Sequence, residues 1–318
     1  MALLTVENLS VGYHTRKGFL KSVQGVSFAL AEGESLGLVG ESGCGKTTIG
    51  MSLMGLLPEN AAVTDGRILF EDKDLLKLSK KEIRQVRWKK IAMIFQAAMN
   101  ALNPVHRVSE QIAEAILAHD TEISEETAMK QVESLFQVVG IPPDRMRDYP
   151  HQYSGGMKQR AIIAMALSCN PSLIIADEPT TALDVIVQDQ ILNAIKDFQK
   201  RLNVSLIFIS HDIAVVADVC DSIGIMFAGQ LVEYGNVKDV FDVPMHPYTR
   251  SLLASYLTLD KDIVQLDSKP GETPDLVNPT PGCRFSERCT VSKAACSLNT
   301  PEWVEISPTH KALCNQFK

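Results

Sequence analysis

Long apolar runs are missing from this sequence: no uninterrupted apolar segment approaches the roughly 18 residues that a membrane-spanning helix needs. The segment 1–7 also lacks the basic start and the long apolar core of a secretory signal peptide. Positive charge is not in excess either, since 31 Lys and Arg residues stand against 38 Asp and Glu residues, a formal net charge of −7. That balance argues against bulk binding to nucleic acid. We therefore expect a soluble, cytoplasmic chain.

Internal repeats and low-complexity tracts are absent as well, which argues against a repeat architecture and against a long disordered segment. What is present is a chain of 318 residues of which 45% are hydrophobic. That amount of apolar side chain suffices for one large core and a smaller second unit.

The apolar pattern predicts an α/β fold. From about residue 35 to residue 227, short apolar strands alternate with amphipathic helices, which implies a mostly parallel sheet covered by helices. These strands are expected at residues 35–39, 91–95, 173–176, 206–209 and 222–227. An N-terminal antiparallel part is expected from the alternating segments 3–9, 26–31 and 66–70, which Gly-containing turns separate.

Strand signals vanish over residues 97–155. Residues 109–119 and 125–139 carry helical spacing instead, and Pro142-Pro143 breaks the chain after them. We therefore predict a helical insertion over about 97–155 in a large first domain that spans residues 1–255. A small Cys-containing C-terminal domain is expected over residues 256–318.

A phosphate-binding loop is predicted at residues 40–47, where Gly-Glu-Ser-Gly-Cys-Gly-Lys-Thr matches G-x-x-x-x-G-K-[ST] between a predicted strand and a predicted helix over 48–54. Glycines let backbone N–H groups converge on phosphate, and the helix N-terminus adds a positive dipole end. We expect Lys46 to reach the β- and γ-phosphates of ATP and the Thr47 hydroxyl to bind Mg²⁺. The residues expected to contact the nucleotide here are Gly40, Ser42, Gly43, Cys44, Gly45, Lys46, Thr47 and Thr48.

Two carboxylates, Asp177 and Glu178, end another predicted strand. Carboxylates at the carboxyl end of a parallel strand lie where open α/β sheets bind ligands. We expect Asp177 to be a Mg²⁺ partner, usually through water, and Glu178 to polarise the attacking water as a general base. Together with the phosphate loop, this pair predicts an ATPase.

A third motif, Ser154-Gly155-Gly156, precedes a run with helical spacing. We expect it to form a helix N-terminus that can donate N–H groups to phosphate. The stretch continues as Met157-Lys158-Gln159-Arg160 and resembles the signature of ATP-binding cassette proteins.

With these motifs in hand, the chain resembles an ABC transporter ATPase subunit of the bacterial dipeptide and oligopeptide importer family over nearly its whole length. The resemblance implies that Tyr13 stacks on adenine, that Gln96 joins Mg²⁺ to the membrane interface and that His211 contacts the γ-phosphate. Ala182-Leu183-Asp184 matches the D-loop of the family. Each of these residue types is more often an ordinary surface or core residue, and only its order relative to the stronger motifs favours these roles.

The last part of the chain differs in composition. Six of the 15 prolines lie between Pro270 and Pro308, and four of the seven cysteines are found there or shortly beyond: Cys283, Cys289, Cys296 and Cys314. So small a segment buries little core and needs a cross-link such as a disulfide or a bound metal to be stable. A reducing compartment disfavours disulfides. The sequence has no close C-x₂₋₄-C pair of the kind usual in zinc sites, and four thiolates at wider spacing suit an iron–sulfur cluster.

The resemblance points the same way, because residues 246–249, 270–272 and 283–285 look like the tail of peptide importers, some of which carry a [4Fe–4S] cluster. Zinc and unliganded thiols stay open as alternatives.

The resemblance also implies partners and a place of work. A second ATPase subunit, identical or paralogous, supplies its signature so that two ATP molecules are sandwiched in a dimer. Two membrane permease subunits and an extracytoplasmic solute-binding protein complete the importer at the cytoplasmic face of the membrane, with no nucleic acid involved. Transport is driven through the helical insertion and the Gln96 loop.

Three other functions stay open. The same ATPase role in nickel or other small-solute uptake is one of them. A soluble cassette ATPase that works on DNA or ribosomes is another, although such proteins usually carry two cassettes or a long coiled coil. The third is a sensing module in which the cysteine tail is the main function and ATP is regulatory.

Overall fold

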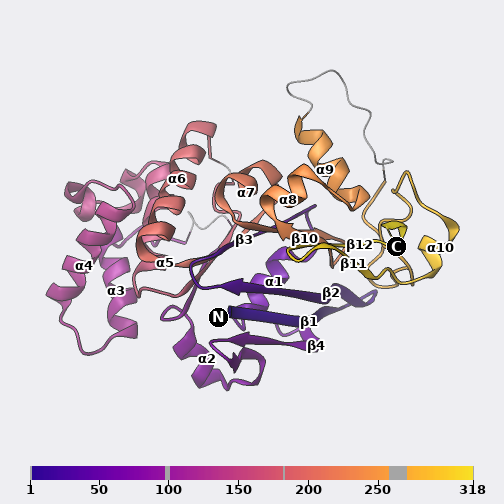
Figure 1. The fold of residues 1–318 in the computed structure, drawn as a ribbon. Coiled ribbons are helices and arrows are strands. Elements are labelled where there is room, and N and C mark those ends of the chain that lie inside the picture. The colour runs from indigo at the N-terminus through magenta and orange to yellow at the C-terminus, as the bar shows by residue number, and fades with distance from the viewer. Residues whose placement is uncertain (1, 97–100, 182, 258–270, 318) are drawn as a thin grey trace. The chain divides into compact units, whose positions relative to one another are not determined.

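The computed structural model describes residues 2–96, 101–181, 183–257 and 271–317 (Figure 1). The chain divides into two compact units. The first is made of Met1–Leu30, Ser35–Lys77 and Phe208–Lys318, and the second of Ala31–Glu34 and Leu78–Ile207. Within the described residues, no helix combines the length and the apolar character that crossing a membrane requires.

An antiparallel sheet opens the first unit, as the alternating N-terminal segments predicted. Its order is β2-β1-β4-β5. The strands are β1 (Ala2–Thr15), β2 (Gly18–Ala31), β4 (Ala61–Phe70) and β5 (Lys73–Asp74). In β1 the buried side chains change phase, from Leu4 and Val6 to Leu9 and Val11, because a register shift follows Glu7. One sheet face therefore stays apolar along the whole strand.

The first unit also contains the strand that leads into the phosphate loop. β3 (Ser35–Gly40) is buried throughout and pairs in parallel with β9 (Ser222–Phe227). β10 (Gln230–Asn236) runs antiparallel to β9. Continuous apolar burial is the pattern expected of strands covered on both faces. The predicted strands 35–39 and 222–227 are thus confirmed.

The C-terminal segment extends this sheet. β12 (His310–Leu313) pairs with β10, and β11 (Trp303–Ser307) pairs with β12, both antiparallel. The buried carboxylate of Glu233 on β10 accepts hydrogen bonds from the backbone N–H groups of Met245 and His246. It also lies 2.7 Å from Nε2 of His310. Strand pairing and this buried carboxylate tie the tail to the rest of the first unit.

Short helices surround these strands in the first unit. They are α1 (Lys46–Leu53), α7 (Ile213–Val219), α8 (Val237–Asp242), α9 (Pro247–Leu257) and α10 (Ala294–Leu298), with 3₁₀ turns η1 (Leu75–Lys77) and η5 (Asn315–Phe317). The predicted domain boundary between residues 255 and 256 falls in α9, and residues 258–270 lie outside the described residues.

The second unit is mainly helical around a parallel strand pair, β6 (Ile91–Ile94) and β7 (Leu173–Asp177). Its helices are α2 (Lys80–Val86), α3 (Val108–His119), α4 (Glu125–Val138), α5 (Gly155–Leu167) and α6 (Val185–Leu202), with 3₁₀ turns η3 (Pro143–Arg147) and η4 (Pro150–Gln152). β8 (Ser205–Ser210) lies where the chain passes from this unit into the first.

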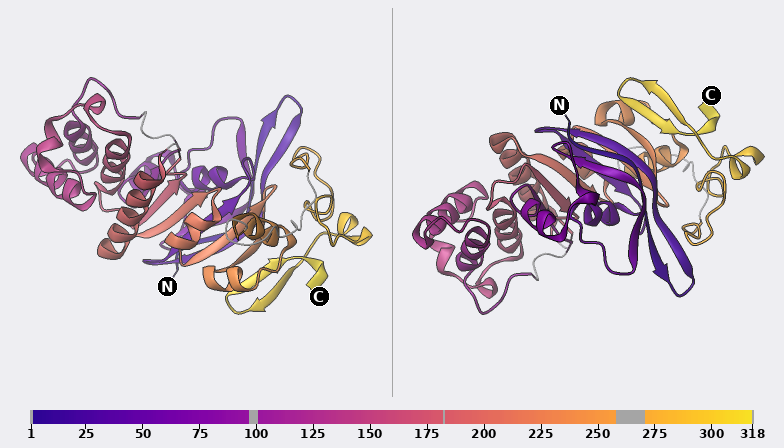
Figure 2. Two further views of the ribbon diagram at one scale, coloured as in Figure 1. Left: turned by 90° about the horizontal axis from the view of Figure 1, so that it is seen from above. Right: turned by 90° about the horizontal axis from the view of Figure 1, so that it is seen from below.

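Helices α3, α4 and α5 pack together within the second unit (Figure 2). In α4 the buried side chains Ala128, Val132 and Phe136 recur every four residues and so share one face of the helix. The two helices predicted for this region are confirmed to within one residue at each end. Residues 97–100, where the insertion was predicted to begin, lie outside the described residues.

Candidate nucleotide site and cysteine pocket

The phosphate loop connects β3 to α1 in the first unit. Gly45 takes the position before α1 with φ +104°, a backbone conformation that favours glycine. A Cβ atom at Gly45 would lie 2.5 Å from the backbone oxygen of Ser22, and one at Gly40 would lie 2.1 Å from that of Met226. The loop therefore needs glycine at both positions because neighbouring backbone approaches so closely.

Lys46 begins α1, and its side chain is buried. Its ammonium group donates hydrogen bonds to the backbone oxygens of Gly40, at 2.6 Å, and Glu41, at 3.1 Å. The positive charge consequently lies inside the curve of the loop, at the end of the helix where backbone N–H groups are exposed. A charged amine and a helix N-terminus together make a binding site for anions.

Two further predicted nucleotide residues lie in the same unit. The Tyr13 hydroxyl is 3.0 Å from Oγ1 of Thr48, in the first turn of α1, so the structure brings these two residues together. His211 is exposed and lies between β8 and α7, beside Asp212, which caps α7 by accepting from the N–H of Ala214. Their contacts with a nucleotide remain predictions.

The paired carboxylates of the second unit follow β7. Asp177 is buried and ends the strand, whereas Glu178 is half-buried and has φ +48°. The Glu178 carboxylate accepts a hydrogen bond of 2.8 Å from Nε2 of Gln96, a residue 82 positions earlier. A left-handed backbone at a non-glycine residue is a local strain that is often found at functional sites. Two side chains singled out in the sequence for different reasons are thus in direct contact.

Thr181 is a member of this group that sequence reasoning missed. Its hydroxyl donates a 2.9 Å hydrogen bond to the same Oε2 atom of Glu178. The signal available in the sequence was its position three residues after Glu178, since a polar residue at that spacing in a turn can reach back to the first residue.

The signature motif opens α5. The helix N-terminus predicted from the sequence is present, and the Ser154 side chain caps it by accepting from the N–H of Met157. A Cβ atom on Gly156 would lie 2.6 Å from Cγ1 of Val187 on α6, so this glycine allows the two helices to approach. Asp184 caps α6 through the N–H of Val187, at 2.9 Å. Ala182, the first residue of the predicted D-loop, lies outside the described residues.

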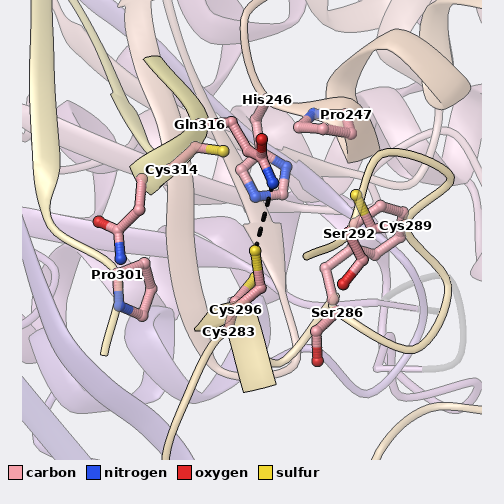
Figure 3. A pocket seen from close by; sticks show the side chains of 12 residues that line it. His246, Pro247, Cys283, Ser286, Cys289, Ser292, Cys296, Pro301, Cys314 and Gln316 are labelled. Carbon is pink, nitrogen blue, oxygen red and sulfur yellow. Dashed lines mark hydrogen bonds between the residues drawn. The ribbon is translucent and has the colours of Figure 1, made fainter. Parts of the chain in front are cut away.

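The four tail cysteines line one small cavity of about 20 Å³ in the first unit (Figure 3). Its lining includes Cys283, Cys289, Cys296 and Cys314, together with His246 and Gln316. Nε2 of Gln316 donates to the sulfur of Cys296 at 3.3 Å. Sequence reasoning missed Gln316, because a single glutamine outside any motif gives no sign that it lies beside the cysteines.

Burial dominates the chemistry of these thiols. It raises the pKa of Cys283 to about 11, and the neighbouring Cys314, Cys289 and Cys296 add to the effect because a second negative charge close by is unfavourable. Within the described part of the chain, no group of three or more His, Cys, Asp or Glu side chains is arranged to hold a metal ion. The four cysteines surround one shared cavity.

A glycine-rich loop between a buried strand and a helix, with carboxylates at the end of a second strand, defines a P-loop ATPase. The ABC transporter family model matches residues 23–181, and that of the oligopeptide/dipeptide transporter C-terminal region matches residues 232–296. The chain belongs to the ABC transporter family, in the branch that carries this C-terminal region.

Curated relatives agree over nearly the full length. The chain is 49% identical to the dipeptide transport ATP-binding protein DppD of Bacillus subtilis (strain 168), a match that covers 98% of this chain and 94% of the relative. It is 41% identical to the oligopeptide transport ATP-binding protein OppD of Escherichia coli (strain K12), over 98% of this chain and 93% of the relative.

Solved structures show the same fold. The ATP-binding cassette MJ0796, described as a dimer in a post-hydrolysis state bound to ADP and Pi, is 25% identical with a TM-score of 0.66, over 74% of this chain and 98% of that one. The protein cbiO1 from Clostridium perfringens, part of the transporter complex cbiONQ, is 28% identical with a TM-score of 0.67, over 81% of this chain and 95% of that one.

Proposed function

We propose that this chain is the subunit of a membrane importer that binds and hydrolyses ATP to drive uptake of dipeptides or oligopeptides. The observation that carries the proposal is the 49% identity to a dipeptide transport ATP-binding protein, which runs through both the cassette and the tail. Cassette ATPases with other functions share the phosphate loop, so the loop alone does not indicate peptide transport. The match of residues 232–296 to the oligopeptide/dipeptide transporter C-terminal region supports it.

For the first unit, we assign the ATP-binding role to the phosphate loop and α1. Lys46 holds the β- and γ-phosphates, and the loop N–H groups orient them. The hydrogen bonds from the Lys46 ammonium group to Gly40 and Glu41 support this role, because they place the charge inside the curve of the loop. Tyr13 stacks on adenine and His211 contacts the γ-phosphate. When bound, Mg²⁺ would supply the charge that neutralises the leaving phosphates. Thr47 is its proposed partner in this unit, and Gln96 and Asp177 are the partners proposed in the second unit.

For the second unit, we assign the general base to Glu178. A carboxylate can accept a proton from water only if its orientation is held while the bond to phosphorus forms. The hydrogen bonds from Gln96 and Thr181 to Oε2 of Glu178 hold this carboxylate in one orientation. Gln96 directly precedes the predicted helical insertion, so its hydrogen bond to the base supports its proposed role in coupling hydrolysis to transport.

Two such ATPase subunits act as a pair. Ser154, Gly155 and Gly156 of one subunit close over the ATP held by the other, and Asp184 contributes from the D-loop. The solved dimer of a related cassette supports this arrangement. ATP favours the closed pair because its γ-phosphate contacts both subunits, so hydrolysis removes the preference and the pair opens. The partner is a second copy or a paralogue.

The remaining partners are two permease subunits and an extracytoplasmic solute-binding protein, with the ATPase pair held at the cytoplasmic face of the membrane. The importer contains no nucleic acid.

We further propose that the four tail cysteines bind a [4Fe–4S] cluster. Such a group takes one thiolate at each of four iron atoms and therefore needs sulfurs spread around a volume. In support of this proposal, the four cysteines line one shared cavity in the first unit. Zinc bound by the same thiols is the alternative.

The test is to isolate the protein from gently solubilised membranes and identify its companions, then to measure its ATPase activity in vesicles. Two permeases, together with stimulation of hydrolysis by a peptide-loaded binding protein, would support peptide import. Stimulation by a nickel-loaded binding protein would instead assign the substrate to nickel. Recovery with ribosomes or DNA would overturn the importer proposal.

A further inference from the structure

The phosphate loop carries a carboxylate of its own. Glu41 is the first variable residue of the loop, and a negative charge there repels the phosphates that the loop is to hold. Both of its oxygens are taken by one guanidinium group from the tail: Nη2 of Arg288 lies 2.8 Å from Oε1, and Nη1 lies 2.9 Å from Oε2. Such a forked pair fixes both the charge and the orientation of a carboxylate.

Arg288 is itself held in place. Its guanidinium lies over the ring of Phe227, 5.4 Å from the centroid, and over that of Phe285, at 5.8 Å. Its side chain is 16% exposed, so the pair with Glu41 is partly shielded from water. The hydrogen bonds to Glu41 raise the pKa of Arg288, which therefore stays charged. This pair is stronger than an ordinary surface ion pair because little side-chain freedom remains to be lost.

A second tail residue holds the backbone of the same loop position. The N–H of Glu41 donates to the hydroxyl oxygen of Tyr248, at 3.1 Å. Tyr248 is buried, and its ring packs against those of Phe227 and Phe285. The tail therefore restrains Glu41 by side chain and by main chain, across 247 and 207 residues of sequence.

We propose that Arg288 and Tyr248 are positioning residues for nucleotide binding, Arg288 by neutralising and holding the Glu41 carboxylate and Tyr248 by holding its backbone. This inference rests on the proposed role of the loop as the ATP site. All five side chains of this group lie in the first unit: Glu41, Phe227, Tyr248, Phe285 and Arg288. The C-terminal region thus completes the phosphate loop.

The loss of nucleotide affinity without Arg288 should depend on the number of phosphates in the nucleotide. Without Arg288, the Glu41 carboxylate repels bound phosphates, and the repulsion grows with their number. Arg288→Gln should weaken ATP binding about tenfold and ADP binding less, and the loss should shrink at high salt because ions screen the repulsion. Tyr248→Phe should weaken both nucleotides equally, by about threefold, because it removes one hydrogen bond and no charge.

The experiment measures dissociation constants of the full chain for a fluorescent ATP analogue with Mg²⁺, with unlabelled ATP and ADP as competitors. The double variant Glu41→Gln with Arg288→Gln should bind ATP within about twofold of the wild type, because it removes the unpaired charge. Arg67→Gln is the matched control, since Arg67 pairs with Glu7 across strands β1 and β4 and not with Glu41. It should bind as the wild type does.

The outcomes separate two failures. If the wild-type chain does not bind ATP, the proposed function fails. If it binds and Arg288→Gln binds as tightly, the inference alone is overturned. An equal loss for ATP and ADP, without recovery in the double variant, would also overturn it, since that result describes a merely structural arginine. Recovery in the double variant shows in addition that the Arg288→Gln loss is not a folding defect.

Discussion

Glu178 combines the features expected of a catalytic carboxylate at the scale of a single residue. It directly follows a buried strand, has a left-handed backbone, and receives two hydrogen bonds on one oxygen. A residue in this conformation stays there only if its surroundings hold it. Gln96 and Thr181 supply that support.

Replacing the proposed base should separate binding from chemistry. Glu178→Gln keeps the size and the hydrogen-bonding ability of the side chain but cannot accept the proton of water. We expect ATP binding close to that of the wild type and hydrolysis about 100-fold slower or more, since general bases typically contribute at least that much. Single-turnover hydrolysis with Mg²⁺ measures the effect.

Thr181→Val is the control for this experiment, because it removes one supporting hydrogen bond and keeps the carboxylate. A smaller loss of rate is expected than for Glu178→Gln. Normal turnover by Glu178→Gln would remove Glu178 from the role of base.

Helices α5 and α6 illustrate the scale of the element, because their first turns meet at one glycine. In the signature motif α5 begins at Gly155, and Asp184 of the predicted D-loop caps α6. The contact between Gly156 and Val187 brings these two caps together. The spacing of the two helices therefore depends on the absence of a side chain at position 156.

Filling that space should destabilise the second unit. Gly156→Ala places a methyl group 2.6 Å from Cγ1 of Val187, and overpacking of this kind costs about 1–3 kcal/mol. We expect the thermal unfolding midpoint to fall by on the order of 5 °C. The double variant with Val187→Ala should recover most of the loss, because the shortened side chain makes room. An unchanged midpoint for Gly156→Ala alone would show that α5 and α6 are not closely packed here.

The role of the C-terminal tail also depends on how its elements pack, because packing decides which cysteines lie together. Its four cysteines lie far apart in sequence, yet they line a single cavity. Protein purified without oxygen should contain about four iron atoms and four acid-labile sulfides per chain, as a [4Fe–4S] cluster requires. A double variant with Cys283→Ser and Cys289→Ser should contain neither.

Cys220→Ser is the matched control, since Cys220 is buried outside this cavity and is expected to leave iron and sulfide unchanged. Zinc without sulfide would replace the cluster by a zinc site. Neither metal nor sulfide would leave four unliganded thiols.

At the scale of the whole molecule, we propose that ATP drives transport by holding two ATPase subunits together as a dimer. Glu178→Gln provides the test, because it traps ATP in a state that cannot proceed. We expect this variant to sediment as a dimer with ATP and Mg²⁺ and as a monomer with ADP, if the partner is a second copy. A chain that pairs with a paralogue should dimerise only when that subunit is added.

Lys46→Ala in the Glu178→Gln background serves as the control, because weakened phosphate binding should leave the protein monomeric with ATP. A Glu178→Gln protein that binds ATP but stays monomeric, even with its paralogue, would contradict the proposed ATP-dependent dimerisation.

Much of the fold followed from local patterns. Continuous apolar runs predicted β3 and β9, and four-residue spacing predicted α4, because both signals come from neighbours along one element. The phosphate-loop motif and the start of α5 at the signature were likewise predicted, since each is a pattern of a few consecutive residues. Longer strands such as β1 were underestimated, because a register shift at Glu7 breaks the alternation that marks a strand.

The chain's own sequence determined its class of enzyme, since a phosphate loop, a strand ending in carboxylates and a signature are each short segments with local chemistry. Tertiary structure decided which distant side chains meet: Gln96 with Glu178, four cysteines around one cavity, and Arg288 with Glu41. The physical reason is that contacts across tens to hundreds of residues depend on how elements pack, and a single sequence carries no periodic trace of them.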